Sequence, residues 1–358
     1  MGKSVVFVLS SLNDPHFQKR VKEFIGHGYS VFVYGFLREG QGVPVLDYKY
    51  TVLGTIRERD YFSRLALYFK SMYKLAKKYR GSVFFFSSLD IALFARLFIR
   101  GKYIYEVCDL TEMALNSKLL RNFLLAANKN TIRKSLITIL TSQGFASFFN
   151  GLDESKYVVI PNRVSPECPK AIPRRPAKDG VLRIGFVGVV RFESVYHFVN
   201  ACKGVSKTEI HIYGIFSEGD KWGGRIQCLI GDYDNIVYHG RFSNPVDLPS
   251  IYSNIDLVLC AYTPSPGVNY AEPNKLYESL YFNCPIIVSK GTYLGEKVDQ
   301  LGIGYSIDSM NEESVLSFVN EFDHEDYNVK LNNCEMYPKS ECIDCYDFFF
   351  DSLDGMAI

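Results

Sequence analysis

The sequence predicts an α/β protein with two parallel-sheet domains in tandem, and three observations support this fold class. The chain has 358 residues, and a domain usually holds roughly 100–200 residues. Short β-branched and aromatic runs alternate with helical segments, a pattern typical of right-handed βαβ crossovers in a parallel sheet. The alternation stops at a segment with five prolines, residues 161–180, and then restarts. Such a segment is typical of a linker between domains.

The composition excludes several other classes of protein. Hydrophobic residues make up 47% of the chain and charged residues 22%, which is too apolar for a disordered chain. No apolar run approaches the ~18–20 residues that a membrane-spanning helix needs. The nine cysteines are odd in number and scattered, unlike a disulfide framework. The start of the chain resembles a first core strand more than a signal peptide, so we expect a cytoplasmic protein.

The first half is expected to open with a buried strand at Val5–Leu9. A helix should follow at Asp14-Pro15, because aspartate caps helix ends and proline fits the first helical turn. Gly26 and Gly28 should end that helix. Further strands are expected at 30–36, 82–86, 103–107 and 136–140, and further helices at 57–80, 91–99 and 119–134.

The second half is expected to repeat this pattern. Strands are expected at 182–187, 209–213, 236–239, 257–260 and 285–288, and helices at 195–202 and 274–282. An aromatic helix at 343–353 is expected to cross back to the first domain. We therefore expect a first domain at 1–165 completed by a C-terminal helix at about 340–355, a linker at 166–180 and a second domain at 181–339.

The net charge of +1 hides an uneven distribution along the chain. Residues 1–165 hold 24 Lys and Arg against 12 Asp and Glu, a net charge of +12, and the remainder holds 16 against 27, a net charge of −11. A cationic first half attracts nucleic acid, anionic lipid headgroups or phosphorylated substrates. The alternative is that the split has no functional meaning.

The densest basic stretch, residues 57–80, predicts an amphipathic helix. Its apolar positions recur at spacings of three and four: Tyr61, Phe62, Leu65, Tyr68, Phe69, Met72, Leu75 and Ala76. Lysines and arginines occupy its other faces. Two interpretations remain open: the apolar face packs on the core under a solvated basic face, or the helix lies on a membrane surface.

Ligands of open parallel sheets bind beyond the carboxyl ends of the strands, and with two such sheets the expected site is the cleft between the domains. Gly188 and Arg191 follow the first strand of the second domain. Glycine lets a backbone approach a ligand closely, and arginine offers a fork to phosphate oxygens. The glycine pattern is not G-x-G-x-x-G, so a nicotinamide cofactor has no fingerprint here.

A second candidate site begins at Pro273, which stops a helix from starting before Asn274. Asn274, Lys275 and Leu276 would then form a first helical turn with free backbone amides, and a helix N-terminus with a lysine suits a diphosphate. Glu278 lies three residues after Lys275 on nearly the same face and can accept both hydroxyls of a ribose. The alternative is a surface helix with an ordinary Lys–Glu pair.

Polar side chains also follow two strands of the first domain. Asp14, His16 and Arg20 come just past the first strand, and Glu106 and Asp109 come at the end of the strand at 103–107. His16 is a candidate for binding substrate or the leaving phosphate, or it merely occupies a first helical turn. Asp109 is the stronger candidate, before Glu106, for orienting or activating an acceptor hydroxyl.

These motifs together resemble a known family of enzymes. FVGVVRF, HIYG, VYHGRF with LPSIYSNIDLVLCAY, and PNKLYESLYFNCPIIVS span roughly residues 180–290. In order and spacing they resemble the donor half of retaining glycosyltransferases of the GT-B fold, most closely family 4, which builds bacterial surface polysaccharides such as capsule and lipopolysaccharide. YEVCDL at 105–110 fits the acceptor domain of the same family. The resemblance implies two Rossmann-like domains facing a cleft, with a C-terminal helix crossing back to the N-terminal domain.

The resemblance also implies roles for single residues. Arg191 and Lys275 would hold the donor's diphosphate, which stabilises the charge that develops on the leaving group, and Glu278 would hold the ribose. Four further residues would lie beside the donor: Tyr213 and Gly214 lining the pocket, and Gly240 and Arg241 near the nucleobase.

The sequence departs from the family at one catalytic position. Members usually carry a second glutamate eight residues before the ribose glutamate, near the transferred sugar, and this chain has Tyr270 there. The nearest carboxylate is Glu272. Either Glu272 replaces the missing glutamate through a rearranged loop, or the sugar is contacted differently.

No metal and no cofactor are expected, because no DxD pair stands at the strand ends and GT-B transferases generally work without a metal. Cys342-x-x-Cys345 lacks the second half of a zinc site. The expected partners are a nucleotide sugar, a lipid-linked or glycan acceptor and, through the basic first domain, an anionic membrane on its cytoplasmic face; no nucleic acid is expected. Two alternatives stay open: a nucleotide-sugar epimerase of the same fold, or a non-catalytic subunit that binds nucleotide sugars.

Overall fold

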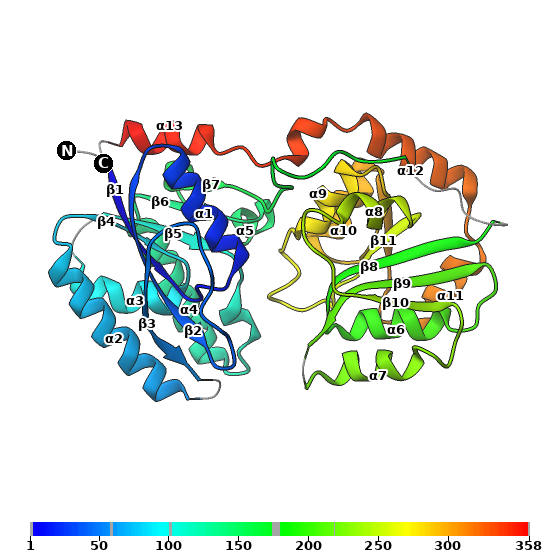
Figure 1. Cartoon of the computed structure of the whole chain (residues 1–358), viewed down its shortest axis with the longest axis horizontal. Helices are drawn as coiled ribbons and strands as arrows, with labels where there is room; N and C mark the ends of the chain where they lie inside the picture. Colours follow the sequence, from blue (N-terminus) through cyan, green and yellow to red (C-terminus); the bar gives the residue numbers. More distant parts are fainter. Residues whose placement is uncertain (1–2, 58–59, 100–101, 174–179, 218, 357–358) are drawn as a thin grey trace. The chain divides into compact units, whose positions relative to one another are not determined.

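The computed structural model describes residues 3–57, 60–99, 102–173, 180–217 and 219–356. The chain folds into two compact units (Figure 1). Unit 1 consists of Met1–Pro161 together with Cys345–Ile358, and unit 2 consists of Asn162–Asp344. Each unit has its own parallel sheet and its own hydrophobic core.

Unit 1 contains a seven-stranded sheet. Its strands are β1 (Ser4–Leu9), β2 (Ser30–Arg38), β3 (Tyr50–Ile56), β4 (Val83–Phe86), β5 (Tyr103–Val107), β6 (Ile137–Leu140) and β7 (Tyr157–Val159). Its helices are α1 (Pro15–Gly26), α2 (Tyr61–Lys78), α3 (Leu89–Phe98), α4 (Lys118–Lys134), α5 (Gln143–Phe148) and α13 (Asp347–Gly355). Short 3₁₀ turns lie at Thr111–Ala114 and Glu154–Lys156.

All pairings in this sheet are parallel, and the strand order is β3-β2-β1-β4-β5-β6-β7. The central strands are buried on both faces, as their continuous apolar runs predict. The predicted cap of the first helix is confirmed: the carboxylate of Asp14 accepts a hydrogen bond from the amide of His16 at 3.0 Å, with Pro15 in the first turn.

The C-terminal helix α13 belongs to unit 1, as the sequence predicted (Figure 1). Phe350 packs against Phe24 of α1, with ring centroids 4.9 Å apart. The Tyr29 hydroxyl donates a hydrogen bond of 2.7 Å to Asp354. An aromatic core contact and a polar contact therefore join two segments more than 300 residues apart in sequence.

Unit 2 contains a six-stranded parallel sheet with the order β10-β9-β8-β11-β12-β13. Its strands are β8 (Leu182–Val190), β9 (Thr208–Phe216), β10 (Ile236–Gly240), β11 (Leu257–Cys260), β12 (Ile286–Ser289) and β13 (Gly304–Ile307). Its helices are α6 (Glu193–Cys202), α7 (Lys221–Leu229), α8 (Leu248–Ser253), α9 (Asn274–Tyr281), α10 (Tyr293–Leu301), α11 (Glu312–Asn320) and α12 (His324–Met336), with a 3₁₀ turn at Lys339–Cys342. Its sheet separates two core clusters.

The unit boundaries differ from the expected ones. Residues 162–165 and 340–344 fall in unit 2, because the backbone of Val164 pairs with that of Cys342 and Asp344. The expected linker at 166–180 also lies within unit 2, and Cys168 is buried in its core. Residues 174–179 of that linker lie outside the described residues. The prolines correctly predicted irregular backbone in the described part of this segment, but that backbone packs on the core of unit 2.

Several elements were missed by the sequence reasoning. The third and seventh strands, the last strand of unit 2 and six helices were not expected: β3, β7, β13, α5, α7, α8, α10, α11 and α12. Helix α7 shows the reason, because its sequence KWGGRIQCL contains two adjacent glycines that favour loops. The strand expected at 182–187 was also too short, since β8 continues through Gly188 to Val190.

Helix α2 confirms the predicted amphipathic helix but corrects which apolar residues face the core. Tyr68, Met72 and Leu75 are buried. Phe62 is 88% exposed and Phe69 is 48% exposed, so these two do not belong to the core face. The helix therefore carries an exposed apolar stripe in addition to its buried face.

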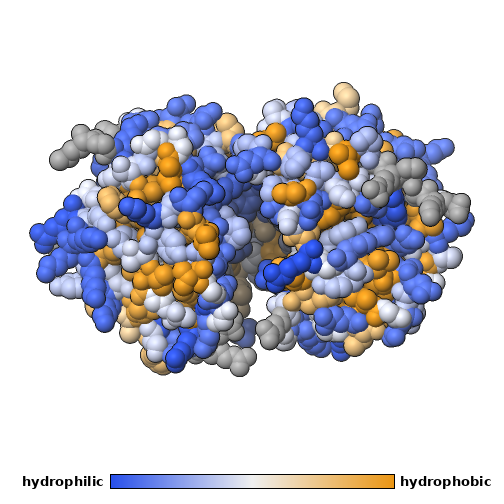
Figure 2. Space-filling view, viewed as in Figure 1, coloured by the Kyte–Doolittle hydropathy of each residue, from blue (hydrophilic) through white to orange (hydrophobic). Residues whose placement is uncertain are grey.

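On the face of each unit seen in Figure 2, hydrophilic and hydrophobic residues are interspersed, and the margin of unit 1 over α2 is strongly hydrophilic. Among the helices that the structure describes, none has both the length and the apolar composition that crossing a bilayer requires.

Candidate functional site

The N-terminus of α9 is the centre of the candidate site in unit 2. Pro273 is extended, with φ −73° and ψ 155°, and α9 begins at Asn274, as the sequence predicted. Among the described residues no side chain caps this helix end. A helix start of this kind presents backbone amides and the positive end of the helix dipole to an anion.

Glu278 is held by three donors at this helix end. The Lys275 ammonium contacts Oε2 at 2.7 Å, the Tyr252 hydroxyl donates to the same oxygen at 2.7 Å, and the Asn274 amide donates to Oε1 at 2.6 Å. Glu278 is 2% exposed and Lys275 is 6% exposed. Burial, followed by the charge of Glu278, raises the pKa of Tyr252 well above its usual range, so this phenol stays protonated as a donor.

Leu276, the remaining residue of the predicted first turn, is fully buried in the core of unit 2. Its amide donates to the carbonyl of Pro273 at 3.1 Å. Its side chain therefore anchors α9, and only its backbone lies at the helix start.

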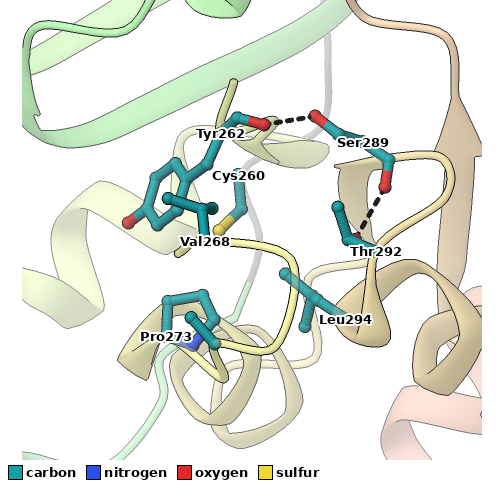
Figure 3. Close-up of a pocket in the computed structure, with 8 residues that line it drawn as sticks. Cys260, Tyr262, Val268, Pro273, Ser289, Thr292 and Leu294 are labelled. Carbon is teal, nitrogen blue, oxygen red and sulfur yellow. Dashed lines mark hydrogen bonds between the residues drawn. The ribbon is translucent and has the colours of Figure 1, made fainter. Parts of the chain in front are cut away.

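A small hollow lies beside Pro273, at the carboxyl ends of β11 and β12 (Figure 3). Eight residues line it: Cys260, Tyr262, Val268, Ala271, Pro273, Ser289, Thr292 and Leu294. The Ser289 hydroxyl donates to the carbonyl of Tyr262 at 2.7 Å, and the Thr292 hydroxyl donates to the carbonyl of Ser289 at 2.8 Å. The space inside it that is open to the centre of a water-sized sphere is about 10 Å³, which is room for about one water molecule. The hollow by itself therefore does not hold a nucleotide.

Arg191 follows the end of β8 and is exposed. Its guanidinium lies 5.1 Å from the ring centroid of Phe192, and Phe192 stacks on Tyr262 with centroids 4.4 Å apart. Burial, Cys260 and Glu278 raise the pKa of Tyr262, whereas the charge of Arg191 lowers it. The end of β8 and the α9 site therefore meet at Tyr262.

Gly188 and Gly214 have a structural role that the sequence did not reveal. They lie opposite each other in β8 and β9, with φ of 147° and 140°. A Cβ on Gly214 would lie 1.8 Å from the carbonyl oxygen of Gly188, so only glycine fits there. These glycines allow two strands to pair closely, and Gly188 lies within β8 instead of following it as expected.

The other predicted donor residues lie at the ends of β9 and β10. Tyr213 is 8% exposed and stacks on His239, with ring centroids 4.2 Å apart and planes 6° apart. Gly240 ends β10 in the left-handed region at φ 78°, and Arg241 after it is exposed. His239 also contacts His211, with Nε2 and Nδ1 2.9 Å apart.

Glu272 is buried in unit 2, where its carboxylate contacts the Tyr277 hydroxyl and the Lys297 ammonium. These contacts tie the loop before α9 to α9 itself and to α10. Tyr270 is half-buried in the same loop. In this arrangement Glu272 is engaged by protein groups, so contact with a sugar would require it to leave both of them.

In unit 1, His16, Arg20 and Glu106 come together as one cluster. The Glu106 Oε1 atom lies 2.8 Å from His16 Nε2 and accepts hydrogen bonds from Arg20 at 2.9 and 3.0 Å. The Glu106 side chain is fully buried, whereas His16 is 20% exposed. Burial by itself raises the pKa of Glu106, but the charges and hydrogen bonds of Arg20 and His16 outweigh it and hold the pKa at about 2.

This cluster changes the expectation for Glu106. Its buried carboxylate is committed to Arg20 and His16 and is not presented to an acceptor, whereas Asp109 is exposed past the end of β5. Asp109 therefore stays the candidate for an acceptor hydroxyl, and that role stays a prediction.

One group of metal-ligating types occurs in the same place. Among the described residues, ligand atoms of His16, Glu106 and Cys108 lie within 4.8 Å of one another. Arg20 already places a cation on the carboxylate, and burial raises the pKa of the Cys108 thiol well above its usual range. A protonated thiol and a guanidinium make this a poor donor set for a metal.

Two functional candidates escaped the sequence reasoning. Tyr252 lies 26 residues before Glu278 in an apolar segment, and Lys297 lies 25 residues after Glu272. Tyr252 lies in the motif LPSIYSNIDLVLCAY, but nothing in that motif pointed to Glu278, and no motif marked Lys297. Both contacts depend on how helices pack in unit 2.

No family model and no curated protein sequence matches this chain. Solved structures do resemble it. Sucrose-phosphate synthase from Thermosynechococcus elongatus has a TM-score of 0.74 at 12% identity, over 99% of this chain and 98% of that one. A glycosyltransferase from Rickettsia africae has a TM-score of 0.71 at 13% identity, over 99% and 98%. HepE from Anabaena, solved with UDP and glucose, has a TM-score of 0.66 at 13% identity over the whole of both chains.

These likenesses cover both units and show the fold. The chain has the GT-B fold of two parallel-sheet α/β domains, as the sequence predicted.

Proposed function

We propose that this protein is a glycosyltransferase that moves a sugar, with retention, from a nucleotide-diphosphate sugar to a lipid-linked or polysaccharide acceptor. The observation that carries the proposal is the start of α9, where Lys275, Glu278 and uncapped backbone amides lie together at the carboxyl edge of the sheet. The GT-B fold, shared with HepE structures that contain UDP or UDP-glucose, supports it.

In this proposal the donor's diphosphate binds at the α9 start and is held by Lys275 and Arg191. The anion replaces Glu278 as the partner of Lys275, and Glu278 then accepts the ribose hydroxyls. Stabilising the charge that develops on the leaving diphosphate is the main catalytic contribution. Gly240 and Arg241 lie near the base, and Tyr213 and Gly214 support that part of the site from β9.

We assign Glu272 a positioning role in place of sugar contact. Its contacts with Tyr277 and Lys297 fix the loop that leads into α9. His16 and Asp109, in unit 1, are proposed for the leaving phosphate and the acceptor hydroxyl respectively.

The acceptor side of the proposal follows from charge. Residues 1–165 carry a net charge of +12, which suits an enzyme that meets an anionic cytoplasmic membrane face carrying a lipid-linked acceptor. Bacterial surface polysaccharide, such as capsule or lipopolysaccharide, is the product class that we propose. No metal or other cofactor takes part in the proposed reaction.

Binding and turnover of a panel of nucleotide sugars, starting with UDP-glucose, test this function. Calorimetry measures the affinity for the nucleoside diphosphate, and release of that nucleoside diphosphate together with free sugar measures slow donor hydrolysis with and without a chelator. The Glu278→Ala and Lys275→Ala variants are expected to weaken binding at least about tenfold. The matched controls are Lys203→Ala and Glu313→Ala, at exposed positions of unit 2.

The outcomes separate the candidates. Donor hydrolysis or transfer that persists in chelator supports the proposal, and product anomers seen by NMR test retention. Isomerisation of the sugar would identify an epimerase. Binding without turnover would identify a non-catalytic subunit, for which the tyrosine at position 270 is the motivating observation. Absence of nucleotide binding, or equal affinity of the Glu278→Ala variant, would contradict the proposed site.

A further inference from the structure

Large apolar side chains are exposed on α2, α3 and α4 out of proportion to the size of these helices. The three helices hold 45 residues, yet they carry nine of the 24 exposed large apolar residues in the described part of the chain. These nine residues, here called the three-helix patch, are Tyr61, Phe62, Leu65, Phe69, Tyr73, Leu97, Leu119, Leu120 and Phe123. Single exposed apolar residues are normal, but a concentration of them marks an interaction surface.

The patch belongs to one side of unit 1, because α2 packs against α3 and α3 packs against α4 (Figure 1). Phe69 and Tyr73 of α2 both contact Phe98 of α3, with ring centroids 4.9 and 5.6 Å apart. On α2, exposed residues 62, 65, 69 and 73 recur at spacings of three and four and form one stripe. Rings that contact across helices and still reach solvent form a rigid apolar surface.

The most exposed members of the patch occur near the starts of two helices. Phe62 of α2 is 88% exposed, and Leu119 and Phe123 of α4 are 85% and 67% exposed. Leu119 and Phe123 are four residues apart and share a helix face. None of these side chains is needed to fill the core of unit 1.

The basic residues around the three-helix patch indicate which partner it binds. Helices α2 and α4 together contain ten lysines and arginines and no aspartate or glutamate. Lys70 and Lys77 are exposed and lie three residues before and four residues after Tyr73, so they flank the apolar stripe. Aromatic and aliphatic side chains bordered by cations are the combination by which interfacial helices bind anionic bilayers.

We infer that the three-helix patch is a docking surface for an anionic phospholipid bilayer, into which Phe62, Leu119 and Phe123 insert while the surrounding lysines and arginines contact headgroups. This inference deepens the membrane contact proposed above and rests on that part of the proposed function alone. It adds an apolar component to the attachment, so binding should weaken with salt without being abolished by it.

Co-sedimentation of the full chain with vesicles tests the inference. The probes are vesicles of phosphatidylcholine alone and of phosphatidylcholine with about one-third phosphatidylglycerol, at about 0.1 and 0.5 M salt. The expected result is binding to the anionic vesicles that salt reduces in part, and at least about tenfold weaker binding to the neutral ones.

Two sets of variants separate the apolar and charged parts. The triple variant Phe62→Ser, Leu119→Ser, Phe123→Ser and the double variant Lys70→Glu, Lys77→Glu are each expected to weaken anionic-vesicle binding about tenfold or more. Matched controls are Val45→Ser, Val329→Ser, Met336→Ser and Lys170→Glu, Lys203→Glu, all at exposed positions outside the patch. All substituted side chains are exposed, and circular dichroism checks that each variant is folded.

Failure of wild-type protein to bind anionic vesicles at low salt would overturn the inference. Equal binding by patch and control variants would overturn it too, as would self-association through the patch without vesicle binding. Nucleotide affinity, measured on the same variants, is expected to stay unchanged because the donor residues lie in unit 2. Vesicle binding and nucleotide binding can therefore fail separately, which distinguishes this inference from the proposed function.

Discussion

Each unit buries a carboxylate at its candidate site, and the two carboxylates are held in different ways. In unit 1, Glu106 lies on strand β5, and its partners Arg20 and His16 come from α1, 86 and 90 residues earlier. In unit 2, Glu278 lies on α9, and two of its partners, Asn274 and Lys275, are on the same helix.

The hydrogen bonding of the two carboxylates differs as well. In unit 1 all three contacts converge on Oε1 of Glu106, while its Oε2 and Arg20 Nη1 are buried without hydrogen bonds to the described residues. In unit 2 both oxygens of Glu278 accept hydrogen bonds. Arg20 and Glu278 are each 2% exposed, so the two carboxylates differ in how their oxygens are hydrogen-bonded and not in burial.

The comparison teaches that a buried charge pair has two uses. The Arg20–Glu106 pair is part of the framework of unit 1 and leaves the edge of His16 exposed. In the function proposed above, Lys275 and Glu278 are ligand-binding groups that neutralise each other until a ligand separates them. Substitutions in the two pairs test this difference. A change in the Arg20–Glu106 pair should alter folding, and a change in the Lys275–Glu278 pair should alter nucleotide binding.

The largest expected effect belongs to Glu106→Gln. Removing this charge leaves the Arg20 guanidinium buried without its counter-ion, which costs about 3–5 kcal/mol of unfolding free energy. Urea denaturation followed by fluorescence measures it. Asp109→Asn, at an exposed neighbour, is the control and should change the unfolding free energy by less than about 0.5 kcal/mol. A cost below about 1 kcal/mol for Glu106→Gln would contradict the framework role.

Acid titration is expected to sharpen the same contrast. The folded pKa of Glu106, at about 2, lies below its unfolded value of 4.5. Its contribution of about 3 kcal/mol is therefore fully present above pH 4.5 and is lost as the pH falls from 4.5 towards 2. Unfolding free energy measured across this range should fall less steeply in Glu106→Gln than in the wild type. Parallel acid profiles for the two proteins would show that the pKa of Glu106 is not depressed.

In unit 2 the expected effect is on binding. Lys275→Met keeps the length of the side chain and removes its charge, so the affinity for a nucleotide diphosphate should fall roughly 30-fold, or about 2 kcal/mol. Calorimetry measures it, with Lys203→Met as the matched control. If Lys275→Met lowered the unfolding free energy by more than Glu106→Gln does, the comparison between the two carboxylates would be reversed.

The smallest expected effect belongs to Tyr252→Phe. It removes one of the two hydrogen bonds to Glu278 Oε2 and leaves the aromatic ring in the core, so nucleotide affinity should fall about fivefold, or about 1 kcal/mol. Tyr281→Phe is the control, since its hydroxyl makes only a 3.5 Å contact with the carbonyl of Cys168. Equal affinities for Tyr252→Phe and the wild type would show that Tyr252 does not orient Glu278.

Much of the α9 site could be predicted from the sequence because its contacts are local. Pro273 sets the start of the helix, and spacings of three and four residues place Lys275 and Asn274 against Glu278. The contact of Tyr252 could not be predicted, since α8 meets α9 only through the packing of unit 2. The same holds for Glu272, whose contact with Lys297 of α10 also depends on the packing of unit 2.

The sequence by itself determined the alternation of strands and helices, the caps and starts of helices such as α1 and α9, and the charge of each half of the chain. These depend on backbone preferences and on side chains within about one helical turn. Only the tertiary structure decided that Glu106 is sealed against Arg20, that Gly214 has no room for a side chain, and that Phe62 reaches solvent. Those outcomes depend on which distant segments meet, and close packing is a property of all neighbours at once.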